Sequence, residues 1–224
     1  MITVILLPMT STISTDAPYR SSTKIARACA LLSGVTGLVA GLLLVGDFAL
    51  DNPYDPTPSG PTWLGAANDV VGIVQFAAFA PVVWALRRRL PTTRSVRVST
   101  VAAVAAAIAY VVLSILLVAG VMTFQQQIGL LIVMIVVIYV WLLIANLAAH
   151  RFRTLPRSVT LFGVMVGVGL LVGLVLVGAS LVVPNPVGQI IGWPGYILGF
   201  LGWLGLPVYS LLLAAKVFTD REKR

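Results

Sequence analysis

Long uninterrupted runs of hydrophobic residues dominate the chain, and short groups of charged residues and prolines separate them. The hydrocarbon core of a bilayer is about 30 Å thick, so a helix needs about 20 apolar residues to span it. Runs of this length occur at residues 25–48, 64–86, 99–121, 129–149, 158–183 and 196–217. These runs are apolar on all faces, whereas a membrane-spanning strand alternates polar and apolar residues. The pattern therefore predicts an all-α integral membrane bundle of six transmembrane helices.

The positions of the basic residues predict how the helices thread the membrane. All 15 Lys and Arg lie before or at the start of the first run, between the second and third, between the fourth and fifth, or from the end of the sixth onward. With six spans these positions share one side, whereas Asp47, Asp51 and Asp55 gather on the other. Cytoplasmic connections carry the excess of Lys and Arg. We therefore expect both termini in the cytoplasm.

One transmembrane domain with short flanking segments follows from this pattern. We expect a flexible leader over residues 1–24, the domain over 25–217 and a cytoplasmic tail over 218–224. The proline-rich connection 51–63 should be extended and stiff. Residues 123–127 should form a tight hairpin turn, and residues 184–195 should lie in the membrane interface. We expect Tyr54, Trp63 and Trp193 to form the aromatic belt at the membrane interface away from the cytoplasm.

Composition excludes several classes of protein. Hydrophobic residues make up 59% of the chain and charged residues 10%, against roughly a quarter charged in soluble domains. The net charge of +8 comes from short clusters, and not from the continuous basic face that nucleic acid requires. We therefore expect no nucleic-acid partner. Cys29 is the only cysteine, so no intrachain disulfide can form.

Small residues recur at the spacing that allows close helix contact. Helices in lipid associate through such residues and through shared hydrogen bonds, because burying apolar surface gains little there. The spacing occurs at Gly37 with Gly41, Gly163 with Gly167, Gly169 with Gly173, and Gly195 with Gly199 and Gly202. We interpret these glycines mainly as contacts within the bundle. Pro81 and Pro207 should bend the second and sixth helices.

Asp69 is the most informative single residue. It is the only acidic residue well inside an apolar run. Such residues usually face protein or water and often serve transport or catalysis. Asn68, Gly72 and Gln75 form one helical stripe beside it. The stripe is either polar glue between helices or a functional site, and both interpretations stay open.

Two tyrosines near the predicted midplane, Tyr110 and Tyr139, are further candidates. They could close a pocket over Gln75, or they could hydrogen-bond within the bundle, because a buried hydroxyl needs a partner. The candidate ligand-binding residues are Asn68, Asp69, Gln75, Tyr110 and Tyr139. No catalytic residue is assigned.

Several chemistries lack the residues they need. One histidine, one cysteine and scattered carboxylates do not make a metal site. The glycine-rich stretches lack the Lys and Ser/Thr of a phosphate-binding loop, and no paired-aspartate motif is present. His150 and Ser180 fall at opposite ends of the predicted bundle, so they cannot form a hydrolase dyad. We expect no metal and no cofactor.

Three stretches carry a family resemblance: NDVVGIVQFAAFAPVVWALRRRLP (68–91), WLLIANLAAHRFRTLPRSVTLFGV (141–164) and LGLPVYSLLLA (204–214). With them the chain resembles a bacterial membrane family known as domain of unknown function 4386. The resemblance implies a helical bundle and no particular activity. Arg far exceeds Lys, and Ala, Val and Gly are abundant, which is typical of a GC-rich bacterium and indicates the plasma membrane.

The sequence leaves three functions open. The leading hypothesis is a non-enzymatic bundle that binds a lipid-like small molecule or a membrane partner. The second is a small proton-coupled transporter in which Asp69 titrates and Pro81 and Pro207 flex. The third is an intramembrane enzyme that acts on an isoprenoid or lipid, with Asp69 as general acid. Membrane lipids and a small hydrophobic ligand are the expected partners.

Overall fold

Six α-helices make up almost all of the computed structural model, which describes residues 16–50 and 63–219. They are α1 (Asp16–Leu50), α2 (Trp63–Leu86), α3 (Arg94–Val118), α4 (Phe124–Phe152), α5 (Arg157–Val182) and α6 (Val187–Lys216), with a short 3₁₀ helix, η1 (Arg87–Arg89), directly after α2. All six α-helices are long and apolar enough to cross a membrane, and the described residues contain no strand. The predicted all-α membrane bundle is confirmed.

Two helices extend well beyond the predicted apolar runs. α1 begins at Asp16, so part of the expected leader is helical. α6 begins at Val187 and has Pro194 inside it, so most of the expected interfacial loop is also helical. The leader residues 1–15, the connection 51–62 with Asp51, Tyr54 and Asp55, and the tail residues 220–224 lie outside the described part of the chain.

Two of the helices are capped at their first turn by a side chain. The Thr93 side chain accepts a hydrogen bond from the backbone N–H of Val96 and caps α3. Thr123 and Gln126 form a reciprocal capping box at the start of α4. The three glutamines that we predicted in a hairpin turn therefore belong to α4, and the turn lies before them, where Gly120 has a φ of 71°.

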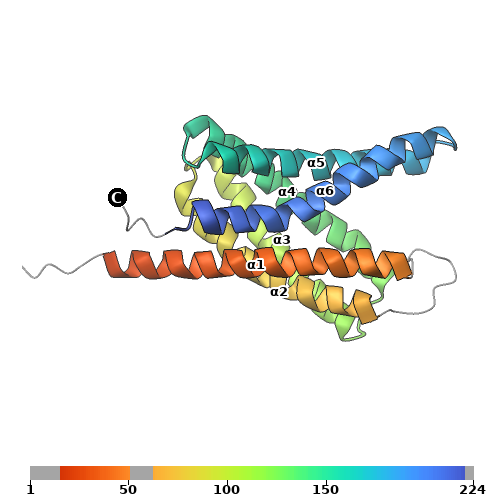
Figure 1. Ribbon diagram of the computed structural model, residues 1–224, viewed down its shortest axis with the longest axis horizontal. Coiled ribbons are helices and arrows are strands. Elements are labelled where there is room, and N and C mark those ends of the chain that lie inside the picture. Colours follow the sequence, from red (N-terminus) through yellow and green to blue (C-terminus); the bar gives the residue numbers. More distant parts are fainter. Residues whose placement is uncertain (1–15, 51–62, 220–224) are drawn as a thin grey trace, which may run out of the picture.

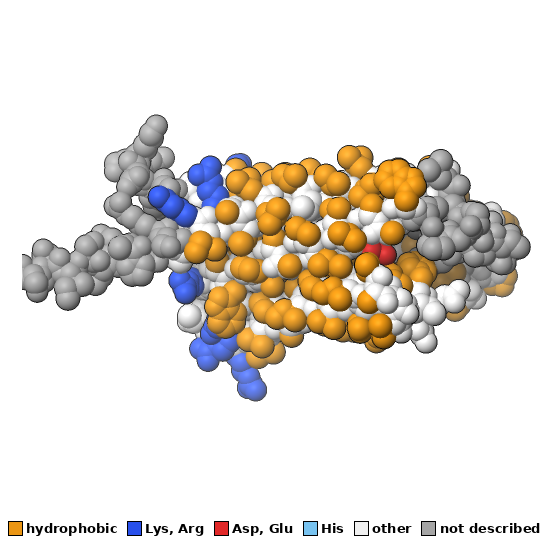
Figure 2. Space-filling model, turned by 90° about the horizontal axis from the view of Figure 1, so that it is seen from below, with side chains coloured by type: hydrophobic (Ala, Val, Ile, Leu, Met, Phe, Trp, Pro, Cys, Tyr) orange, Lys and Arg blue, Asp and Glu red, His pale blue; other side chains and the backbone are white. Residues whose placement is uncertain are grey.

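The helices form a closed ring in chain order. Each helix packs on the next one, and α6 returns to pack on α1, as Figure 1 shows. Hydrogen bonds join helix ends that are far apart in sequence, from Arg88 to Ser22 and from Lys216 to Ser158. Lys and Arg gather at this end (Figure 2), which we call the basic end, and the other is the opposite end.

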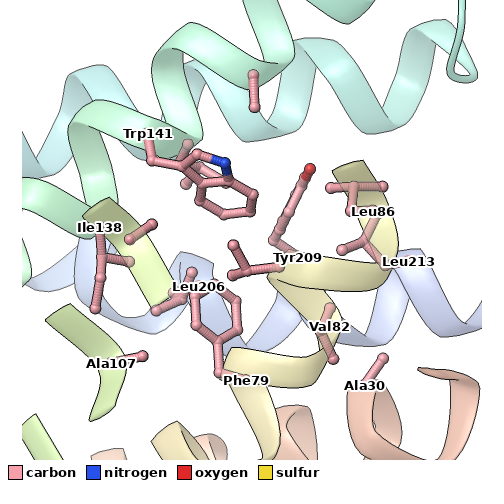
Figure 3. Packing of buried hydrophobic residues seen from close by; sticks show 14 of the residues in the cluster. Ala30, Phe79, Val82, Leu86, Ala107, Ile138, Trp141, Leu206, Tyr209 and Leu213 are labelled. Carbon is pink, nitrogen blue, oxygen red and sulfur yellow. The ribbon is translucent and has the colours of Figure 1, made fainter. Parts of the chain in front are cut away.

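Aromatic side chains from alternate helices fill the interior. Phe79 of α2, Trp141 of α4 and Tyr209 of α6 are all 0% exposed, and they lie close together in Figure 3. The rings of Phe79 and Trp141 pack edge to face at 5.9 Å. The other three helices contribute mainly small residues to the core, among them Ala30 of α1 and Ala107 of α3. Large and small residues thus alternate around the ring.

Glycines bring α5 and α6 into backbone contact. A Cβ atom on Gly173 would lie 2.6 Å from the Cα atom of Gly199 and 2.8 Å from the carbonyl oxygen of Gly195. A Cβ atom on Gly202 would lie 2.5 Å from the backbone nitrogen of Leu170. These faces therefore pack inside the bundle, as their spacing predicts.

We expect Gly173→Ala to destabilise the protein by about 2 kcal/mol or more, because the new methyl group meets backbone atoms that cannot move aside. The matched control is Gly178→Ala on the same helix, where a Cβ atom would have no neighbour within 4 Å. Thermal unfolding in a neutral detergent measures both variants. Equal melting temperatures for the two variants would show that the α5–α6 contact is looser than the distances at Gly173 indicate.

Candidate functional site

Asp69 lies in the second turn of α2, near the opposite end of the bundle. At 1.5 Å per residue it is roughly 9 Å along the axis from the first residue of the helix. Its side chain is partly exposed, and it makes no hydrogen bond or ion pair within the described ranges 16–50 and 63–219. Figure 2 shows acidic atoms at the surface of an otherwise apolar face, toward the end opposite to the Lys and Arg.

A second carboxylate, that of Asp47, approaches Asp69 from α1. Asp47 is only 8% exposed. A Cβ atom on Gly65 would lie 3.3 Å from both of its carboxylate oxygens. Gly65 is one helical turn before Asp69, and the two acids are close enough to interact electrostatically. The missing side chain at position 65 therefore lets the Asp47 carboxylate lie directly against α2.

Tyr110 approaches the same part of α2 from α3. Its ring lies over Phe76 with a centroid distance of 3.9 Å. A Cβ atom on Gly72 would lie 3.4 Å from the Tyr110 hydroxyl oxygen. That hydroxyl interacts with Asp69 electrostatically, and Ser114 lies close to it, one turn further along α3. The tyrosine thus links the acidic pair to the end of α3.

A fully buried amide, Gln127 of α4, completes this group of residues. Its Nε2 donates a long hydrogen bond of 3.4 Å to the Ser114 hydroxyl, and its side chain is 0% exposed. Its Oε1 is the one buried side-chain oxygen or nitrogen among the described residues that lacks a hydrogen-bond partner. Rotating the amide by 180° would leave the NH₂ group short of partners instead. We call Asp47, Asp69, Tyr110, Ser114 and Gln127 the polar cluster.

The other predicted site residues lie beside this cluster or further inside. Asn68 is partly exposed next to Asp69. Gln75 is buried between helices, where a Cβ atom on Gly37 would lie 2.7 Å from its Nε2 and 2.6 Å from Cγ of Pro207. Tyr139 donates a 3.1 Å hydrogen bond to the carbonyl oxygen of Gly202 on α6. The structure thus brings Asp69 and Tyr110 together, whereas Gln75 packs against Gly37 of α1 and Tyr139 hydrogen-bonds to α6.

Sequence reasoning missed Ser114 and Gln127. Ser114 is four residues after Tyr110, which places both on one face of α3. Gln127 is four residues after the cap of α4 and so lies in its first turn. The spacing in α3 was a readable signal, but the inward direction of Gln127 depends on how α4 packs. Within the described part of the chain, no three His, Cys, Asp or Glu residues come together as a metal site.

No protein-family model, curated protein or solved structure matches this chain. The resemblance to domain of unknown function 4386 therefore stays a prediction.

Two buried amides allow a test of whether the polar cluster exists for stability. We expect Gln127→Met to leave the melting temperature unchanged or higher, because it removes an unsatisfied oxygen and only one long hydrogen bond. The contrast is Asn146→Leu. Asn146 donates to the Leu142 carbonyl at 2.8 Å and accepts from the Tyr209 hydroxyl at 3.1 Å.

Asn146→Leu should lower stability by about 1 to 3 kcal/mol, because it leaves the buried Tyr209 hydroxyl without a partner. Thermal unfolding of both variants in the same neutral detergent makes the comparison. If Gln127→Met were as unstable as Asn146→Leu, Gln127 would be a structural residue.

Proposed function

We propose that this protein binds a lipid-like molecule through an amine-bearing head group at the polar cluster, without catalysing a reaction. The observation that carries the proposal is the Asp69 carboxylate, which is partly exposed in an apolar surface and has no cationic partner among the described residues. A ligand is one way to supply that partner.

The charge distribution supports a cationic ligand. The sequence contains no Lys or Arg between Arg27 and Arg87, so neither α2 before its end nor the connection that precedes it provides a positive charge. An ionised carboxylate at the centre of a membrane helix costs about 2.5 to 3.5 kcal/mol, and the cost falls toward the helix ends, where Asp69 lies. An ammonium group offsets that cost, because it brings both a positive charge and N–H donors for the carboxylate oxygens.

The surroundings of Asp69 support a ligand with an alkyl chain. Ile73 lies one turn after Asp69 on the same face of α2 and is partly exposed, and beside it Val70 and Val74 are 49% and 39% exposed. An apolar surface therefore flanks the carboxylate along the helix. A single-chain amine could place its head at Asp69 and its chain along this surface, in contact with the surrounding lipid. The Tyr110 hydroxyl beside Asp69 offers a further polar contact.

Packing in the middle of the bundle favours binding over transport. Phe79, Trp141 and Tyr209 fill the interior and are all 0% exposed. A carrier would have to move these rings apart to pass a substrate from one end to the other. The partial exposure of Asp69 likewise favours binding over an enzyme that shields a reactive intermediate.

The sidedness of the site follows from the positive-inside rule. We place the basic end in the cytoplasm of a bacterial cell and both termini with it, because Lys and Arg are retained on that side. The polar cluster then opens toward the outer leaflet of the plasma membrane. An amine-bearing lipid of that leaflet is the class of ligand that we propose.

Two single-chain amines test this proposal on the full chain in a neutral maltoside detergent. We expect dodecylammonium to raise the melting temperature of the unmodified protein more than dodecyltrimethylammonium does, because only the former has N–H donors. Asp69→Asn should weaken dodecylammonium binding by about 10- to 100-fold, the range for a lost hydrogen bond to a charged group. Asp69→Glu should retain most of the binding.

Asp69→Asn measured without any added amine provides the internal control. Asp69→Asn should express and unfold like the unmodified protein, so that a loss of response is a loss of binding. An unchanged response in Asp69→Asn would contradict the proposal. A proton flux in proteoliposomes that Asp69→Asn abolishes would instead support the transporter.

A further inference from the structure

A second site lies at the basic end, between α1, α2 and the residues that follow α6. It is a pocket with a volume of about 200 Å³. Pro81 and Trp84 of α2 form part of an apolar wall that faces the membrane. The rim carries the guanidinium group of Arg88 and the hydroxyl groups of Ser22 and Thr23. The pocket thus has a cationic, hydrogen-bonding mouth above an apolar floor.

The three arginines of η1 point to different partners. Arg87 lies over the ring of Trp84 at 4.9 Å from its centroid. Arg89 donates to the carbonyl oxygen of Val217, beyond the end of α6. Successive residues of a 3₁₀ helix are about 120° apart, so three consecutive side chains diverge. Arg88 and Arg89 both line the pocket, so one of its two arginines is left without a partner on α2 or at the end of α6.

Arg88 is that residue. It is exposed, and its one polar contact among the described residues is a 3.5 Å hydrogen bond from Nη1 to the Ser22 hydroxyl oxygen. A guanidinium group has five N–H donors in a planar fork. The fork matches two oxygens of a phosphate group. Arg88 therefore has donors to spare at the mouth of a pocket whose floor suits an alkyl chain.

We propose that this pocket binds the phosphate group of an anionic membrane phospholipid. Arg88 contacts the phosphate oxygens, and an acyl chain of the lipid descends along Pro81 and Trp84. A freely soluble phosphate compound would use the rim and leave the apolar wall exposed, so the shape of the pocket favours a lipid. The site is separate from the polar cluster and does not depend on the proposed function.

Native mass spectrometry of the full chain, purified in a neutral detergent, tests this inference. The probes are palmitoyl-oleoyl phosphatidylglycerol and palmitoyl-oleoyl phosphatidylcholine, which share acyl chains and differ in net charge. We expect the unmodified protein to retain phosphatidylglycerol at least about tenfold more tightly, because both lipids offer a phosphate but only phosphatidylcholine adds a quaternary ammonium group that repels the Arg88 guanidinium group.

The decisive comparison is Arg88→Gln with Arg97→Gln. Arg97 is exposed on α3 at the same end and does not line the pocket. Any basic residue near an anionic surface contributes roughly fivefold to affinity. We expect Arg97→Gln to lose at most about fivefold for phosphatidylglycerol and Arg88→Gln to lose about 50-fold or more. Equal losses would reduce the effect to general surface charge and overturn the proposal.

A third variant tests the floor without altering charge. Ala85 lines the pocket, and Ala85→Leu should fill it and abolish the preference for phosphatidylglycerol. A folded Ala85→Leu protein that still prefers phosphatidylglycerol would contradict the proposal. Displacement of the lipid by an equal concentration of inorganic phosphate would also contradict it, because it would show a site for soluble anions.

Discussion

Close approach of helix backbones is the constraint on which this structure depends. Because lipid is as apolar as the helix surfaces, association has to come from packing and from hydrogen bonds between helices. The bundle meets this requirement by setting aromatic residues of α2, α4 and α6 mainly against small residues of α1, α3 and α5, with the Tyr110 ring of α3 as an exception. The polar tips of the aromatic side chains are satisfied as well: Trp141 Nε1 donates to Thr100 Oγ1 at 3.2 Å, and Tyr139 donates to the backbone of α6.

Because aromatic rings fill the middle of the bundle, its two polar sites lie at its ends. The polar cluster and the basic-end pocket lie at opposite ends, and α2 contributes to both of them. Asp69 lies near the start of α2, and Trp84 lies near its end. Between them Phe79 and its neighbours are sealed into the core. α2 and the η1 turn that follows it thus carry two different surfaces, acidic near the start of α2 and basic at η1, which a sealed core keeps apart.

The sequence predicted the six spans because bilayer thickness sets the length of an apolar run, and composition reports it directly. It predicted the ends poorly because a helix can continue past the hydrocarbon core through residues that hydropathy does not mark, such as Gln127 and Pro194. Asp69 stood out as an acid in an apolar run. The inward direction of Gln127 did not, because helices that are apolar on all faces do not show which face meets a neighbour. Rotation about the helix axis is set by packing, and so it appears only in the structure.

The arginines of η1 serve both membrane topology and the basic-end pocket. For threading a membrane only their charge and their position after α2 matter, and any order of Lys and Arg would serve. For a pocket, direction matters: Arg87 packs on Trp84 and Arg89 reaches the end of α6, which leaves Arg88 at the rim. Consecutive side chains of a 3₁₀ helix diverge by about 120°, so the three arginines reach three different partners. The same three residues therefore carry a signal for membrane topology and a specific arrangement of donors.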